Sequence, residues 1–216
     1  MRPPANPVAA ELVGHYQDCF LKHGRTPQGV DWPNAEDLAT RFEVMLGVIR
    51  EGHRRVSILD LGCGPGLLVD YLAKSPRTAP VDYTGIDLSA PMLESARAAW
   101  PSLVFEQRDI LADPLAPQSF DYVILNGVLT ERVSVPREDM IAFATQLLAA
   151  AFAAARVGIA FNVMSKLVDW EREDLFHWGF DEMAAALAPR LSRHIRVRAD
   201  YGLREYTTYV YREPAA

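Results

Sequence analysis

Hydrophobic residues are spaced in two different patterns along the chain, and the pattern changes near residue 55. Over residues 8–22 and 34–50, apolar side chains recur every three or four positions, which predicts two amphipathic helices, the second capped by Asn34. A Gly/Pro-rich link separates them, and the prolines among the first seven residues indicate a loose arm. We therefore expect residues 1–50 to form an N-terminal arm and a helical cap.

Beyond residue 55, short apolar runs alternate with amphipathic stretches of helical period. Such strand–helix–strand repetition builds a parallel sheet with right-handed crossovers and with helices on both faces. Ser89 and Pro91 suit the N-cap and the first turn of one of these helices. The expected strands are 55–62, 81–88, 103–110, 120–127 and 156–164, and the expected helices are 66–75, 90–100, 137–155 and 180–187.

The last two apolar runs, 194–202 and 203–212, alternate polar and apolar residues and are joined only by a turn at Gly202. So short a link permits an antiparallel hairpin and excludes a parallel crossover. The predicted fold class is therefore α/β, with a Rossmann-like, doubly wound sheet of seven mostly parallel strands over residues 51–216. The antiparallel C-terminal hairpin closes this sheet, and the N-terminal helices form a lid within the same structural domain.

The composition is that of an ordinary globular protein, and it restricts the classes of molecule that we expect the protein to bind. Of 216 residues, 50% are apolar, and the formal net charge of −6 disfavours nucleic acid, whose phosphates need a basic surface. No apolar run reaches the roughly 18 residues of a membrane span, and the N-terminus lacks the apolar core of a signal peptide. Cys19 and Cys63 alone form neither a disulfide framework nor a zinc site. We expect a cytoplasmic protein, monomeric or homodimeric, without a metal or a membrane partner.

The most informative stretch is "VSILDLGCGPG", in which a buried-looking strand ends in an acid and then in alternating glycines. Gly62, Gly64 and Gly66 allow the backbone to turn sharply and to approach a ligand closely. They lie at the carboxyl end of a strand, where doubly wound sheets bind ligands. Asp60, just before the turn, could receive a cationic group. A plain strand-to-helix turn would also explain the glycines, so the residues at the neighbouring strand ends must distinguish a ligand-binding loop from a structural turn.

Two further acids close the next two strands. Asp87 in "GIDLS" is suited to accept hydrogen bonds from both hydroxyls of a ribose. Asp109 in "QRDI" is suited to accept one from an adenine amino group, with Ile110 as an apolar wall. Helix capping or a turn would explain either acid alone. Acids at three successive strand ends are a more specific pattern, and it indicates a nucleoside site.

The spacing of the glycines indicates the charge of the ligand. Dinucleotide sites use G-x-G-x-x-G and place a pyrophosphate at a helix N-terminus. This loop reads G-x-G-x-G, follows an acid and contains no basic residue. These features suit a positively charged nucleoside without phosphate, such as the sulfonium S-adenosylmethionine. A nicotinamide-dependent oxidoreductase on a similar sheet is the alternative, and the loop spacing and the antiparallel tail disfavour it.

Together these motifs resemble those of the class I S-adenosylmethionine-dependent methyltransferases over residues 55–212. "ILDLGCGPG" is similar to the first motif of that family, "GIDLS" to its ribose-binding acid, "RDI" to its adenine-contacting stretch and "FDYVILNG" to the strand beside the methyl group. The resemblance implies S-adenosylmethionine as cofactor and S-adenosylhomocysteine as product, without a catalytic role for the loop cysteine. It implies cofactor contacts by Asp60, Gly62, Cys63, Gly64, Gly66, Asp87, Leu88, Asp109, Ile110, Asn126 and Gly127.

The flanking segments resemble a subgroup of small bacterial methyltransferases that act on small molecules. "HGRTPQGVDWPNAEDLATRFEVML", "GIAFNVMSKLVDWEREDLFHW" and "RADYGLREYTTYVYR" carry this likeness. It implies that Trp32 and Arg41 enclose the cofactor and that Arg41 pairs with its carboxylate. A solvated helix face is the alternative for Arg41.

Methyl transfer is an in-line displacement, so the protein contributes mainly alignment and the exclusion of water. A base is needed only for an acceptor hydroxyl of high pKa, and the candidates are His177 and Asp200, although aromatic packing and turn capping would also explain them. We expect methylation of a small molecule, at oxygen first and nitrogen next; the alternatives are a non-catalytic partner protein of this fold and a protein methyltransferase. The residues expected to contact the acceptor are Tyr16, Asn126, Trp178, Tyr201 and Glu205.

Overall fold

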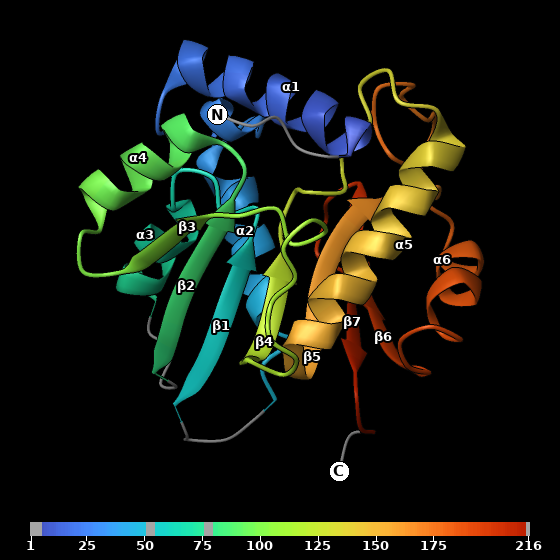
Figure 1. The fold of residues 1–216 in the computed structure, drawn as a ribbon. Coiled ribbons are helices and arrows are strands. Elements are labelled where there is room, and N and C mark those ends of the chain that lie inside the picture. The colour runs from blue at the N-terminus through green and yellow to red at the C-terminus, as the bar shows by residue number, and fades with distance from the viewer. Residues whose placement is uncertain (1–5, 51–54, 76–79, 215–216) are drawn as a thin grey trace.

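A computed structural model of the protein describes residues 6–50, 55–75 and 80–214, and within them the chain builds one seven-stranded sheet (Figure 1). The strand order is β3-β2-β1-β4-β5-β7-β6. The strands are β1 Val56–Leu61, β2 Val81–Asp87, β3 Val104–Gln107, β4 Phe120–Leu125, β5 Ala155–Met164, β6 His194–Arg198 and β7 Glu205–Tyr211. The helices are α1 Pro7–His23, η1 Gln28–Val30, α2 Ala35–Leu46, α3 Leu67–Lys74, α4 Ala90–Ala99, α5 Arg137–Ala154 and α6 Phe180–Leu187.

The sheet is parallel from β3 to β5 and antiparallel at its other edge. β1 pairs with β2 on one side and with β4 on the other, so the strand order reverses between β1 and β4. β7 runs antiparallel to both β5 and β6, and Gly202 turns the chain between β6 and β7 with φ of 78°. The predicted fold class and the predicted C-terminal hairpin are both confirmed. The reversal creates the crevice in which open α/β sheets bind ligands.

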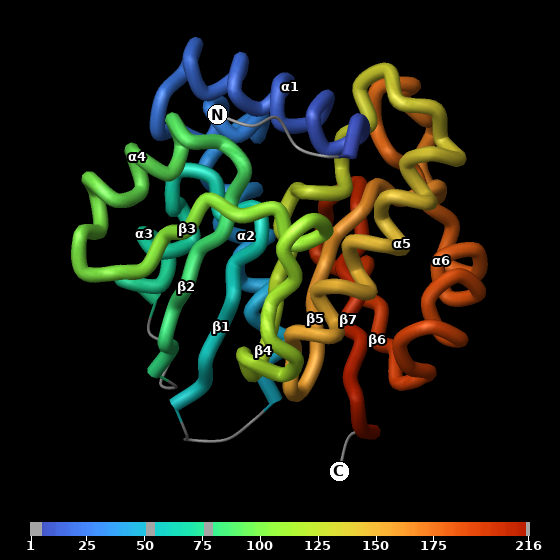
Figure 2. The backbone as a smooth tube through the Cα atoms, viewed as in Figure 1, coloured from blue at the N-terminus to red at the C-terminus, as the bar shows by residue number. Residues whose placement is uncertain are grey.

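Each face of the sheet has its own hydrophobic core, because successive strand residues point to opposite sides. Leu59 and Val123 belong to the core that α5 and α6 cover. Ile58 and Ile124 belong to the core beneath α2 and α3. Figure 2 shows α5 and α6 lying together on one side of the sheet, with α3 and α4 beside β2 and β3. This two-faced burial explains the unbroken apolar runs of the parallel strands.

The helix α1 crosses the carboxyl ends of the strands, from above α4 to beside the loop that precedes α5 (Figure 1). It begins within the predicted arm, because the Asn6 side chain caps it by accepting hydrogen bonds from the Val8 and Ala9 amides at 2.9 and 3.4 Å. Residues 1–5 of that arm lie outside the described residues. None of the described helices combines the length and apolar character of a bilayer span.

The helix α2 ends four residues earlier than predicted. Asn34 caps its start, as expected, by accepting a hydrogen bond from the Asp37 amide at 2.8 Å. At the other end the backbone tightens, because the amides of Gly47 and Val48 donate to carbonyls three positions earlier. Two tyrosines of β7 also reach carbonyl groups there. The Tyr209 hydroxyl donates to the Val44 carbonyl, and the Tyr211 hydroxyl donates to the Val48 carbonyl at 3.0 Å. These two bonds join the C-terminal end of the helix region to a strand 165 and 163 residues away.

Candidate functional site

A cavity opens where the strand order reverses, at the carboxyl ends of β1, β2 and β4. The helix α1 and the residues around η1 cover it. The sequence-predicted residues that line it are Tyr16, Trp32, Asp60, Gly62, Cys63, Gly64, Asp87, Leu88, Asp109, Ile110, Asn126 and Gly127.

The glycine loop has the left-handed backbone that the sequence indicated. The φ angles of Gly62, Gly64 and Gly66 are 79°, 52° and 76°. A Cβ on Gly62 would lie 2.3 Å from a methyl carbon of Val128, so no side chain fits there. Gly66 differs from the other two, because it does not line the cavity and its missing Cβ faces Ala96 and Phe105 at 3.3 Å. Gly66 therefore serves the packing of α3 against its neighbours, and its predicted cofactor contact stays a prediction.

Asp87 ties the glycine loop to the end of β2. One carboxylate oxygen accepts a hydrogen bond from the Gly64 amide at 2.7 Å, and the other accepts one from the Ser89 amide at 2.7 Å. Each carboxylate oxygen can accept a second hydrogen bond, so capacity remains on the side of the cavity. Burial raises the pKa of the Asp87 carboxyl, and the amides of Ser89 and Gly64 oppose that rise. Ser89 occupies the N-cap position of α4, but its hydroxyl makes no capping bond, contrary to expectation.

Asp60 is a buried carboxyl beside Asp87. It accepts a hydrogen bond from the Tyr83 hydroxyl at 2.8 Å. Burial is the main reason that the pKa of Asp60 rises to about 7; the hydrogen bond from Tyr83 lowers it and the charge of Asp87 raises it further. A cation placed in the cavity would favour the ionised form of this acid.

Three buried polar atoms of cavity-lining residues have no hydrogen-bond partner within the described part of the chain. They are the Asp109 Oδ2, the Asn126 Oδ1 and the Ser89 hydroxyl oxygen. The other Asp109 oxygen accepts from the Leu111 amide at 3.0 Å, so one atom is held by the turn and the second faces no donor. Buried polar atoms are nearly always satisfied in proteins. These atoms therefore fit a ligand that brings its own hydrogen-bond donors.

The cavity carries an excess of negative charge. The acids on its wall are Asp60, Asp87 and Asp109, and within the described part of the chain Arg108 is the only Lys or Arg that lines it. The Arg108 guanidinium is already engaged, with its Nε 2.9 Å from an Asp113 carboxylate oxygen and its Nη2 donating to the Pro114 carbonyl at 3.1 Å. Such a wall favours a cationic ligand over a pyrophosphate.

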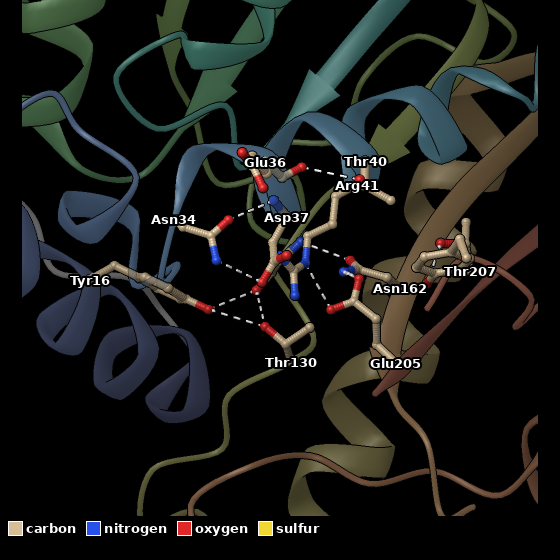
Figure 3. Close-up of polar contacts among 12 residues, drawn as sticks. Tyr16, Asn34, Glu36, Asp37, Thr40, Arg41, Thr130, Asn162, Glu205 and Thr207 are labelled. Carbon is tan, nitrogen blue, oxygen red and sulfur yellow. Dashed lines mark hydrogen bonds and ion pairs between the residues drawn. The ribbon is translucent and has the colours of Figure 1, made fainter. Parts of the chain in front are cut away.

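Arg41 lies beneath the cavity lid rather than on a solvated helix face. Its side chain is 8% exposed, and its Nε donates to a Glu205 carboxylate oxygen at 2.8 Å (Figure 3). The guanidinium carbon lies 3.7 Å from the centre of the Trp32 ring, which itself lines the cavity. The Arg41 Nη1 is buried and has no partner among the described residues. Arg41 itself is not among the residues that line the cavity, so its contact with the cofactor carboxylate stays a prediction.

The ion pair continues into a chain of hydrogen bonds that reaches the end of β4. The second Glu205 oxygen accepts from the Asn162 amide nitrogen at 2.8 Å, and the Asn162 oxygen accepts from the Gly127 amide at 2.8 Å. The Tyr16 hydroxyl donates to the Gly127 carbonyl at 2.7 Å. Both lid helices are thereby connected to Gly127. Sequence reasoning did not identify Asn162, because nothing in the order of residues relates it to a glycine 35 positions earlier.

The two proposed bases lie away from the cavity. His177 is buried with both ring nitrogens engaged, Nδ1 at 2.6 Å from the Ser165 carbonyl and Nε2 accepting from the Arg172 amide at 3.2 Å. Asp200 is exposed, and the Arg198 guanidinium beside it lowers the pKa of its carboxyl. Neither residue lines the cavity, and neither is placed to accept a proton there. The geometry favours the aromatic-packing and turn explanations of these residues over catalysis.

Three expected acceptor contacts are also displaced from the cavity wall. Trp178 is fully buried and packs against Phe176. The Tyr201 hydroxyl lies 3.1 Å from the Thr207 hydroxyl, and Glu205 is committed to the buried ion pair described above. Of the expected acceptor contacts, the cavity brings together only Tyr16 and Asn126.

Comparison with known proteins agrees with this architecture. A family model described as a methyltransferase domain matches residues 58–151. A protein of Mycobacterium tuberculosis named as a methyltransferase is 33% identical over 159 residues, 71% of this chain and 92% of the relative. The malonyl-[acyl-carrier protein] O-methyltransferase of Pseudescherichia vulneris is 36% identical over 98 residues, 45% of this chain and 37% of the relative. Among solved structures, the DhpI–SAM–HEP complex superposes with a TM-score of 0.60 at 18% identity, over 94% of this chain and 97% of that chain.

The chain belongs to the class I S-adenosylmethionine-dependent methyltransferases. It is an enzyme of this family, and S-adenosylmethionine is its methyl donor.

Proposed function

We propose that the three strand-end acids and the glycine loop hold S-adenosylmethionine in the cavity. Asp87 would accept from the ribose hydroxyls and Asp109 Oδ2 from the adenine amino group, while the free Arg41 Nη1 would meet the cofactor carboxylate. The unsatisfied buried acceptors and the acidic wall support this assignment, because the ligand carries both donors and a positive charge. When bound, the sulfonium supplies an electrophilic methyl group.

The acceptor would occupy the apolar half of the same cavity. Side chains from α1 and α5 face each other there, with further aliphatic residues from the loops after β3 and β4. Apolar walls stabilise a hydrocarbon or aromatic body by excluding water from it. The residues of this apolar wall are Leu12, Val13, Leu111, Val128, Phe143 and Leu147.

We further propose that the acceptor atom is an oxygen that is ionised without help from the enzyme. No His or Lys stands among the described residues that line the cavity, and its acids Asp60, Asp87 and Asp109 are assigned above to the cofactor. The Tyr16 hydroxyl stays protonated, because burial raises its pKa, and its proton is donated to the Gly127 carbonyl. It therefore cannot accept a proton from the acceptor. A carboxylate or an acidic phenolate needs no proton removed before it attacks. The P. vulneris relative named as an O-methyltransferase supports oxygen as the acceptor.

The chemical step then balances without a proton transfer. An acceptor lone pair would form the new O–C bond as the C–S bond breaks, and the electron pair of that bond would stay on sulfur. The anionic acceptor would become a neutral ester or ether, with the neutral thioether S-adenosylhomocysteine as the co-product. The protein contributes alignment and a dry cavity, in which opposite charges attract more strongly than in water.

A matched series of acceptors tests this proposal. Octanoate, octanol and octylamine share one apolar tail and differ in the acceptor atom, and citrate serves as a polyanion without a tail. Calorimetry with S-adenosylmethionine comes first, and mass spectrometry then follows methylated products. We expect methyl octanoate and no product from the other three. Methylation of octylamine alone, or of none of the four by protein that binds the cofactor, would refute an ionised oxygen acceptor, and failure to bind the cofactor would refute the site itself.

A further inference from the structure

Three side chains with metal-binding atoms converge on the lid, away from the cavity. His15 and Cys19 belong to α1, and Asp31 follows η1. Their ligand atoms all lie within 4.8 Å of one another, and none of the three residues lines the cavity. The His15 Nε2 is 2.7 Å from the Asp31 Oδ2, and the Cys19 Sγ is 3.9 Å from the same nitrogen.

The backbone explains why these side chains meet. His15 and Cys19 are four positions apart, so they project from the same face of α1 on successive turns. Asp31 has a left-handed backbone, with φ of 61°, and its amide donates to the Gln28 carbonyl at 3.1 Å. The η1 segment packs closely against α1. Two elements separated by a Gly/Pro-rich link thus present an imidazole, a thiol and a carboxylate to one point.

We propose that His15, Cys19 and Asp31 bind one divalent transition-metal ion of the zinc type. Nitrogen, sulfur and oxygen donors together suit Zn²⁺, whereas Ca²⁺ and Mg²⁺ prefer oxygen alone. In a tetrahedral zinc site, neighbouring ligand atoms lie about 3.3 to 3.8 Å apart. The sulfur–nitrogen distance of 3.9 Å is already close to that value. The nitrogen–oxygen contact of 2.7 Å would have to open by about 0.6 Å to admit the ion.

The charges around the cluster also favour a cation. Acidic side chains surround the Cys19 thiol, which feels the charges of Asp31, Glu131 and Asp18, with Lys22 as the opposing charge. Glu131 and Asp31 also repel each other as like charges. A divalent ion would relieve this repulsion among negative groups. The thiol must lose its proton to solvent as the ion binds, because the thiolate is the ligand.

Such an ion would fasten α1 to the segment that follows it. Tyr16 neighbours His15 in α1, and Trp32 follows Asp31 directly; both Tyr16 and Trp32 line the cavity. The rings of His15 and Tyr16 meet edge to face at 5.3 Å. The metal would therefore order the lid from its outer side, without taking part in methyl transfer. A water molecule would take the fourth ligand position.

Metal binding is tested directly on tag-free protein that has been freed of metal with a chelator. Calorimetry measures Zn²⁺ binding, and absorbance detects the thiolate–Co²⁺ charge-transfer band. We expect one ion per chain and a rise in the thermal unfolding midpoint on adding Zn²⁺. The variants Cys19→Ser, His15→Gln and Asp31→Asn should each weaken binding at least tenfold, and Cys19→Ser should abolish the band.

Matched controls separate this cluster from other metal-binding groups. Asp18→Asn and His23→Gln change residues on the same helix outside the cluster, and Cys63→Ser removes the other cysteine of the chain. All three should keep the Zn²⁺ affinity within a factor of three and retain the Co²⁺ band. Absence of binding by the folded wild type, or a band that survives in Cys19→Ser and disappears in Cys63→Ser, would overturn the proposal. None of these measurements depends on methyl transfer, so the result is independent of the proposed function.

Discussion

At the scale of single residues, Asp87 combines a structural and a binding task. Its two oxygens accept the Gly64 and Ser89 amides, and they would also accept the ribose hydroxyls. We expect Asp87→Ala to weaken S-adenosylmethionine binding about 100-fold or more, because two hydrogen bonds to a charged group are each worth about 1.5 to 3 kcal/mol. Isothermal titration calorimetry measures the loss.

Asp82→Asn is the control for this change, since Asp82 lies on the same strand and forms an exposed pair with Arg55. Its affinity for the cofactor should equal that of the wild type. Circular dichroism should show that Asp87→Ala keeps the fold. An unchanged dissociation constant in folded Asp87→Ala would mean that the ribose binds elsewhere.

Residues of this kind were accessible to sequence reasoning because their role follows from their place at a strand end. Asp60, Asp87 and Asp109 each terminate a recognisable apolar run, and parallel strands bring their carboxyl ends together. His177 carried no such constraint. Aromatic neighbours in the chain do not indicate which part of the protein a histidine faces or which backbone groups bond to its nitrogens. In the fold, both ring nitrogens of His177 are bonded to backbone groups.

At the scale of elements, the Arg41–Glu205 pair joins α2 to β7 through a buried contact. The two residues are 164 positions apart, so no local pattern could have related them. Tyrosines of β7 likewise bond to carbonyls near the end of α2 from 165 and 163 positions away. Local periodicity predicted that these elements exist. Which partners they meet depended on the tertiary fold.

A double substitution separates the stabilising role of this pair from its proposed binding role. Glu205→Ala leaves the Arg41 guanidinium buried without its carboxylate, and we expect a loss of about 3 to 5 kcal/mol in the free energy of unfolding. Arg41→Met with Glu205→Leu removes both charges and should recover most of that stability. Urea denaturation measures these changes.

The cofactor affinity should behave differently from the stability. If the Arg41 Nη1 meets the cofactor carboxylate, the double variant remains about tenfold or more weaker in S-adenosylmethionine binding even where its stability has recovered. Wild-type affinity in the stable double variant would show that Arg41 serves the fold alone.

At the scale of the whole molecule, buried acids make the stability depend on pH in an unusual direction. The pKa values of Asp60 and Glu131 both rise to about 7, from ordinary values of 3.8 and 4.5, chiefly through burial. At a pH between the ordinary and the raised pKa values, the carboxyls of the folded protein hold protons that the unfolded chain has released. The contribution of these protonated acids to the free energy of unfolding is complete below about pH 4 and is lost as pH rises through 7. We expect the free energy of unfolding to fall by about 1 to 3 kcal/mol per pH unit between pH 5 and pH 7, at up to about 1.4 kcal/mol per group.

The bound cofactor should reduce this slope, because a sulfonium near Asp60 favours its ionised form and removes the proton from the folded state. Urea denaturation at pH 5, 6, 7 and 8, with and without saturating S-adenosylmethionine, measures both slopes. Asp60→Asn, which keeps an acceptor for the Tyr83 hydroxyl, should flatten the curve of the free protein to that of the complex. Stability that rises from pH 5 to pH 7 would show that these acids are ionised in the folded protein. Equal slopes with and without the cofactor would place its positive charge away from Asp60.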